Sequence, residues 1–136
     1  MSMSIIVVDY TELYFAAIAG KPLPAVVAGK FVQVRNEKFL HVVFSPKEFT
    51  KYHAHIVERF CMDRGIEGTW DARKERYDIT DRSWLIVGGG KFERDTDRKE
   101  LRLSGDSMAY GRFDERGLMQ ALASLPRLSG FKISID

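Results

Sequence analysis

The sequence is poor in cysteine and proline and contains no long apolar run. Its single cysteine, Cys61, cannot form an internal disulfide, which is typical of proteins from a reducing compartment. The apolar runs at 5–8 and 13–19 are too short to span a bilayer, and Asp9 and Glu12 separate them. No basic segment precedes these runs, so a signal peptide is not expected. We therefore expect a cytoplasmic protein with no membrane partner.

The chain also lacks a strong excess of charge. It carries 21 Lys and Arg residues against 19 Asp and Glu, a formal net charge of +2, and the two signs are interleaved. Nucleic-acid binding usually needs a concentrated basic face, so we expect no nucleic-acid partner. The 136 residues are enough for one domain with a core of its own, and we predict a single domain over 1–136.

Short runs of β-branched and alternating apolar residues predict a sheet. The predicted strands are 4–8, 31–35, 38–44, 84–87, 92–94, 99–104 and 131–135. In the strand 38–44, Leu40, Val42 and Phe44 share one face, with Lys38 at its near end. Side chains alternate along a strand, so His41 takes the opposite face.

Three stretches connect these strands. Residues 95–97, Asp-Thr-Asp, predict a hairpin turn. Residues 66–82 mix aromatic and charged side chains and predict a charged hairpin or a pair of loops. Residues 10–20 fit no single element, and the prolines that follow them close the region with a turn.

The pattern after residue 44 predicts the principal helix. Ser45 and Glu48 have the spacing of a capping box, and Pro46 suits the first helical position, where its missing N–H costs nothing. Gly65 suits the helix end. The apolar residues at helical spacing are Phe49, Tyr52, Ile56, Val57 and Phe60.

A second helix is predicted over 114–124 and ends before Pro126. Its inward residues are Leu118, Met119, Leu122 and Leu125. Together these elements predict an α/β (α+β) fold, with a mixed β-sheet of about six strands flanked by two main helices.

The three histidines are placed differently by this pattern. His53 falls within the apolar arc of the first helix, two turns from its predicted start, whereas His55 falls on the polar side. Because they point in different directions, and His41 lies on a strand, they are poorly placed to share one ion. We therefore expect no metal site and no cofactor. Cys61 has no cationic turn beside it and is a poor candidate nucleophile.

Two segments of small residues are candidate anion-binding turns. One is Ser107-Met108-Ala109-Tyr110-Gly111, after the strand 99–104, and the other is Gly88-Gly89-Gly90, followed by Lys91. Small residues let backbone N–H groups come close to an anion. The second segment lacks the spacing and the Ser or Thr of a P-loop. Each alone is consistent with an ordinary loop, but together with His53 they indicate phosphate chemistry.

In this order, the segments Tyr52–Ile56, Gly88–Lys91 and Ser107–Gly111 resemble the phosphohistidine phosphatase (Janus/Ocnus) family. The resemblance covers roughly 37–136 and is most specific in the Ser-Met-Ala-Tyr-Gly run. It implies a compact α/β domain with a mixed sheet. It also implies hydrolysis of phosphohistidine in proteins and peptides without a metal.

The resemblance assigns His53 the catalytic role, as proton acceptor. Imidazole chemistry leaves a second role open, in which His53 transiently accepts the phosphoryl group itself. The implied substrate- and phosphate-binding residues are Lys38, Tyr52, Lys91, Ser107, Met108 and Ala109. Lys91 stands where the family has an arginine, so it keeps the charge but loses the bidentate fork. Two alternatives remain open: a phosphoramidase acting on phospholysine or small phosphoramidates, and a non-catalytic phosphoprotein-binding module. We expect a monomer or weak dimer whose partners are phosphohistidine-containing proteins or peptides.

Overall fold

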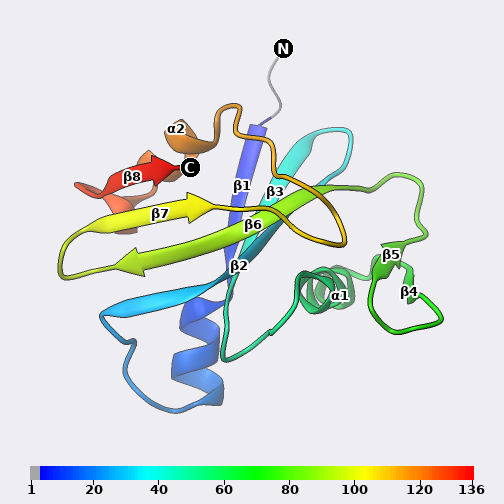
Figure 1. Ribbon diagram of the computed structural model, residues 1–136, viewed down its shortest axis with the longest axis horizontal. Helices are drawn as coiled ribbons and strands as arrows, with labels where there is room; N and C mark the ends of the chain where they lie inside the picture. The colour runs from blue at the N-terminus through cyan, green and yellow to red at the C-terminus, as the bar shows by residue number, and fades with distance from the viewer. Residues whose placement is uncertain (1–3) are drawn as a thin grey trace.

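A six-stranded mixed β-sheet forms the centre of the protein (Figure 1). The computed structural model describes residues 4–136. The strands of this sheet are β1 (Ser4–Asp9), β2 (Val26–Arg35), β3 (Phe39–Pro46), β6 (Leu85–Asp95), β7 (Glu100–Ser104) and β8 (Lys132–Ile135). Their spatial order is β1-β3-β2-β6-β7-β8. The two outermost pairs are parallel and the three inner pairs are antiparallel, which confirms the predicted mixed sheet.

Helices and a small hairpin complete the fold. The helical segments are η1 (a π-helix, Leu13–Ile18), α1 (His53–Arg64), α2 (Leu118–Ala123) and η2 (a 3₁₀ turn, Pro126–Leu128). The strands β4 (Gly68–Trp70) and β5 (Tyr77–Ile79) pair antiparallel in a separate two-stranded sheet, so the hairpin is the one of the two predicted alternatives for 66–82 that is present. Among residues 4–136, no helix is both long and apolar enough to cross a membrane.

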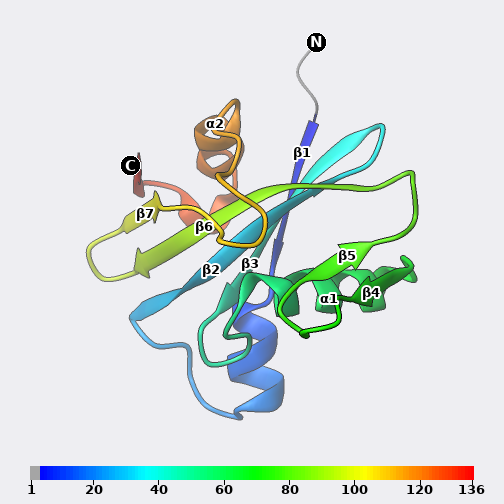
Figure 2. The same cartoon turned by 45° about the vertical axis from the view of Figure 1, so that its right-hand side comes forward.

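The sheet separates two apolar cores because its side chains alternate between its faces. Figure 2 shows α1 and α2 on opposite sides of the sheet. On the α1 side, Val32 and Val34 of β2 belong to a buried cluster with Phe60. On the α2 side, Phe31 belongs to a second cluster with Leu118. The predicted fold class, a mixed sheet flanked by two main helices, is therefore confirmed.

The three consecutive glycines lie inside β6, so their interpretation as a turn is wrong. Gly88, Gly89 and Gly90 pair with the central strand β2. A Cβ on Gly90 would lie 2.7 Å from the Ser104 carbonyl oxygen, and one on Gly89 would lie 2.7 Å from that of Phe31. The missing side chains thus permit close approach of neighbouring backbone, a common reason for glycine within a strand.

The predicted start of the first helix is also wrong. Ser45 and Pro46 end strand β3, and the Thr50 hydroxyl donates a hydrogen bond of 2.5 Å to the Ser45 hydroxyl. The helix begins at His53, and its N-cap residue Tyr52 makes no side-chain capping bond. Pairing with β2 extends β3 through the capping signal, an example of tertiary structure overriding a local preference.

The predicted end of α1 at Gly65 is correct, whereas the predicted bounds of α2 are not. Gly65 adopts φ +67° and terminates α1 as predicted. Helix α2 is shorter than predicted, since Gly117 at φ +71° is its N-cap and Asp114 precedes it in a non-helical segment. Met119 was predicted to face inward but is 42% exposed, because the short helix buries only Leu118 and Leu122.

Candidate functional site

His53 is the first residue of α1, not two turns into it as predicted, and its imidazole packs against β6. The side chain is only 7% exposed. A Cβ on Gly89 would lie 2.8 Å from the Cδ2 atom of this ring. The central glycine of the run therefore provides the space that the imidazole occupies.

The hydrogen bond of His53 defines its tautomer. Its Nε2 atom lies 2.9 Å from the Gly90 carbonyl oxygen. A carbonyl oxygen only accepts, so Nε2 carries the proton and donates it. In the neutral ring, Nδ1 then holds an unshared electron pair. This nitrogen is the basic and nucleophilic atom that His53 can offer.

The surroundings of His53 favour the neutral imidazole. Burial is the main factor that lowers its pKa below the ordinary value, and the hydrogen bond to Gly90 opposes it. Positive charge on Lys30 and Lys91 lowers this pKa further, and Asp106 partly compensates. The ring is therefore predominantly neutral at neutral pH and able to accept a proton or a phosphoryl group.

Lys30 and Lys91 form a cationic pair beside this histidine. They are direct partners in the antiparallel pairing of β2 with β6 and share the sheet face of Val32 and Gly89. The Lys30 Nζ atom also lies 5.3 Å from the ring centroid of Tyr52. Sequence reasoning missed Lys30 because the predicted strand began at residue 31. The alternation of residues 30, 32 and 34 on one strand face was the available signal.

Lys38 is not brought to this cluster. It lies in the β2–β3 turn, where its backbone N–H donates a hydrogen bond of 2.9 Å to Asn36 Oδ1. The pairing runs from Lys30 opposite Ser45 to Arg35 opposite Leu40 before this turn. His53 packs against Gly89, the partner of Val32, and the three further steps to Arg35 correspond to about 10 Å before the turn that holds Lys38 begins. The structure thus separates Lys38 from His53 and places Lys30 there.

The 107–111 segment forms a narrow loop next to β6. The Ser107 N–H donates to the Gly111 carbonyl at 3.0 Å, and the Gly111 N–H donates back to Ser107 at 2.7 Å. The Gly111 carbonyl also accepts a 3.0 Å hydrogen bond from the Gly89 N–H, which anchors the loop beside the strand that contacts His53.

Two backbone amides of this loop are available for a ligand. Within residues 4–136, the N–H groups of Met108 and Ala109 have no hydrogen-bond partner. The Ser107 N–H, expected to bind phosphate with them, is instead used to close the loop. Its side chain can still contribute, since Ser107 Oγ accepts a 3.2 Å bond from the Tyr110 N–H and retains its own hydroxyl proton.

The other histidines and the cysteine lie in different settings. His41 is buried, and its Nδ1 atom lies 3.3 Å from the Val34 carbonyl oxygen, whereas His55 is exposed on α1 near Trp70. Among residues 4–136, no three His, Cys, Asp or Glu side chains gather as a metal-binding group. Burial raises the pKa of the Cys61 thiol to about 11, so it remains protonated at neutral pH.

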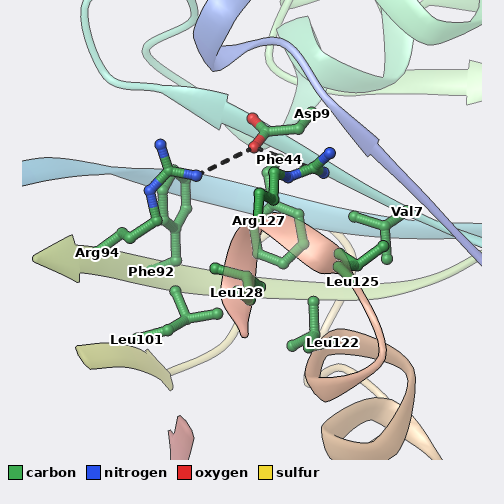
Figure 3. A pocket seen from close by; sticks show the side chains of 10 residues that line it. All are labelled: Val7, Asp9, Phe44, Phe92, Arg94, Leu101, Leu122, Leu125, Arg127 and Leu128. Carbon is green, nitrogen blue, oxygen red and sulfur yellow. Dashed lines mark ion pairs between the residues drawn. The ribbon is translucent and has the colours of Figure 1, made fainter. Parts of the chain in front are cut away.

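A second polar cluster lies on the α2 side of the sheet (Figure 3). Asp9 stands between two arginines, with its Oδ2 atom 3.7 Å from Arg94 and 3.9 Å from Arg127. The Nε atom of Arg94 is buried and has no hydrogen-bond partner in the described part of the chain. The adjoining cavity of about 20 Å³ has room for about one water molecule, which is too little for a substrate.

The fold and the site together define an α+β protein with a neutral histidine, a lysine pair and a loop in which two amides have no partner among residues 4–136. The Janus/Ocnus family model matches residues 29–125. The chain therefore belongs to the Janus/Ocnus family. The match begins before the expected residue 37 and so includes Lys30 and most of β2. No curated protein matches the chain.

Proposed function

We propose that this protein is a metal-independent protein phosphohistidine phosphatase. The observation that carries the proposal is the neutral His53, whose Nδ1 is unprotonated while Nε2–H is held by the Gly90 carbonyl. Such a nitrogen beside two cations and an anion-binding loop is suited to phosphoryl chemistry. Family membership supports the assignment.

In the proposed complex, backbone and lysine groups hold the phosphoryl oxygens. The N–H groups of Met108 and Ala109 donate to them, and the Ser107 hydroxyl can add a third donor. Lys30 and Lys91 supply positive charge from the paired strands. We assign Lys30 the role that the sequence suggested for Lys38, because Lys30 is the lysine beside His53.

His53 then acts in one of two ways. As a base, Nδ1 takes a proton from water, the water oxygen bonds to phosphorus, and the P–N bond breaks as the leaving imidazole takes a proton from solvent. As a nucleophile, Nδ1 bonds to phosphorus while the substrate's P–N bond breaks and its imidazole takes a proton from solvent, and water later cleaves the new P–N bond to release inorganic phosphate. In both cases the Gly90 carbonyl accepts the hydrogen bond from Nε2–H and stabilises positive charge on the ring.

The position of the site favours a phosphoryl group carried on a protein. Met108, at the tip of the loop, is fully exposed, and Tyr52, next to His53, is 51% exposed. A phosphorylated side chain on the surface of another protein can approach such a site without entering a deep pocket. This accessibility supports a protein or peptide substrate.

The proposal is tested by phosphate release from a phosphohistidine peptide in the presence of EDTA. The wild-type protein is expected to be active, and His53→Ala is expected to lose about 10²- to 10⁴-fold in rate. His55→Ala is the matched control, since this exposed histidine lies on the same helix and its loss should leave the rate unchanged.

Other results would overturn the proposal in different ways. An inactive wild-type protein that still binds the peptide would indicate a binding module. Activity abolished by EDTA would contradict the metal-independent mechanism. Faster release from a phospholysine peptide than from the phosphohistidine peptide would assign the site to a phosphoramidase of different specificity.

A further inference from the structure

The β4–β5 hairpin contacts the 107–111 loop through Arg76. The guanidinium Nη1 of Arg76 donates a hydrogen bond to the Ala109 carbonyl, and its carbon lies 4.9 Å from the ring centroid of Tyr110. Arg76 Nε donates a 2.6 Å hydrogen bond to Asp78 Oδ1. One arginine thus joins the hairpin to the loop and is itself oriented by a carboxylate.

A second connection between the hairpin and the loop runs through Tyr110. Its hydroxyl donates a 2.6 Å hydrogen bond to the Tyr77 carbonyl and accepts one of 3.1 Å from the Tyr77 N–H. Burial raises the pKa of Tyr110 to about 12, so the hydroxyl keeps the proton that it donates. The loop is therefore attached to the hairpin at two adjacent residues.

These contacts restrain the peptide unit between Ala109 and Tyr110 at both ends. Its carbonyl oxygen accepts from Arg76, and its N–H donates to Ser107 Oγ at 3.2 Å. This unit directly follows the two amides that have no partner in residues 4–136, those of Met108 and Ala109. A rotation of the peptide that turned the carbonyl toward the ligand would place its negative dipole near an anion.

We propose that Arg76 is a positioning residue that holds the Ala109 carbonyl away from the anion site and so fixes the orientation of the free amides. The inference rests on the proposed function, because it assigns the 107–111 loop to phosphate binding. Arg76 acts through the loop and does not touch the phosphoryl group. The β4–β5 hairpin is accordingly a support for the site, although it lies in a separate small sheet.

The exposure of Arg76 makes the inference testable without disrupting the core. Its side chain is 46% exposed, so substitution removes surface contacts and creates no cavity. Arg73, in the turn of the same hairpin, is exposed and makes no hydrogen bond or ion pair in the described residues. Arg73→Gln is thus a matched control that removes the same charge.

The experiment compares Arg76→Gln, Arg76→Lys and Arg73→Gln in two assays. Inorganic phosphate is titrated while the amide resonances of Met108 and Ala109 are followed by NMR, and KM and kcat are measured with a phosphohistidine peptide. Arg76→Gln is expected to bind phosphate about tenfold more weakly and to raise KM for the peptide with little change in kcat, since a charge-assisted hydrogen bond is lost. Arg76→Lys keeps a cationic donor and is expected to recover part of this loss. Arg73→Gln should match the wild-type protein.

Two results would overturn the positioning role. Wild-type affinity and KM in Arg76→Gln would show that the contact does not matter. Equal losses in Arg73→Gln and Arg76→Gln would show that only net charge matters. Tyr110→Phe is the second variant, since it removes the bond to the Tyr77 carbonyl and should also weaken phosphate binding.

The phosphate titration separates this inference from the proposed function. If the wild-type protein binds phosphate but does not hydrolyse phosphohistidine, the proposed function fails, and the affinity difference of Arg76→Gln still decides the positioning role. If the wild-type protein is active and Arg76→Gln is indistinguishable from it, the positioning role is wrong and the proposed function stands.

Discussion

The imidazole of His53 occupies the space beside β6 that a side chain at Gly89 would fill. A Cβ at this position would lie 2.8 Å from His53 Cδ2 and 2.7 Å from the Phe31 carbonyl oxygen. Neither separation is compatible with a normal non-bonded contact. His53 and the glycine run therefore pack as one unit, although His53 and Gly89 lie 36 positions apart in the sequence.

Substitution of this glycine tests that packing unit. Gly89→Ala is expected to destabilise the protein by about 2 kcal/mol, because an extra methyl group in a closely packed site forces its neighbours to move. It should also lower phosphohistidine hydrolysis, since the ring is the neighbour that must shift. Urea denaturation and the hydrolysis assay measure the two effects. The double variant Gly89→Ala/His53→Ala should lose less free energy of unfolding than the sum of the two single variants, because the shortened side chain leaves room for the new methyl group. A loss equal to that sum would contradict the contact.

The pKa of His53 provides a test of Lys30. Because the positive charge of Lys30 lowers this pKa, Lys30→Gln is expected to raise it toward the ordinary value of about 6.5. In the same variant KM should rise about tenfold through loss of a charge-assisted contact to phosphate. NMR titration of the imidazole protons and steady-state kinetics measure these changes.

Lys38→Gln is the matched control for Lys30→Gln. It removes the same charge from the far turn of β2, so the pKa of His53 and KM should both stay at their wild-type values. Equal changes in the two variants would show that neither lysine acts locally. A change in Lys38→Gln alone would return the substrate-binding role to Lys38.

Stability is expected to decrease as the pH falls from 7 to 5. The pKa values of His41 and His53 are lowered in the folded protein, chiefly by burial. In the unfolded chain both histidines titrate near 6.5, so below that pH the unfolded state binds more protons than the folded state. Urea denaturation across this range measures the loss. Replacement of either histidine by Asn should make the free energy of unfolding depend less steeply on pH. An unchanged pH dependence would show that the replaced histidine does not contribute to it.

The Asp9 cluster predicts a stability effect without an effect on catalysis. Asp9→Asn leaves the largely buried Arg94 without its carboxylate and is expected to cost about 3 kcal/mol in the free energy of unfolding. Arg127→Gln removes a more exposed partner of the same carboxylate and should cost less than about 1 kcal/mol. Chemical denaturation measures both values. The hydrolysis rate of the folded fraction should stay unchanged in each variant, because the cluster lies on the opposite face of the sheet.

The strands with alternating apolar residues were the part of the fold that the sequence predicted best. Runs such as Phe131, Ile133 and Ile135 indicate a strand without further information, and Gly65 marks a helix end by its own conformational freedom. Ser45 was misinterpreted because its capping signal involves only the next three residues, while the pairing that keeps it in β3 is with Lys30 on the preceding strand. Local patterns cannot reveal such competition.

The site was harder to predict than the fold for a related reason. The motifs around His53 and Ser107 are contiguous, so they were visible in the sequence. Lys30 joins His53 only through the pairing of β2 with β6, and Arg76 meets the 107–111 loop only because the hairpin folds against it. Both depend on register and docking, which no local spacing encodes.

The hydrogen bond from His53 to the Gly90 carbonyl has a consequence for mutagenesis. The acceptor belongs to the backbone, so no change of side chain at position 90 deletes it directly. An alanine scan would detect crowding at that position and would miss the electronic role. Replacing the Gly90–Lys91 amide by an ester would weaken the carbonyl as an acceptor and so shift the balance between the two ring nitrogens. The main chain thus determines which ring nitrogen of His53 carries the proton, and this assignment would be retained in any variant that preserved the pairing of β6.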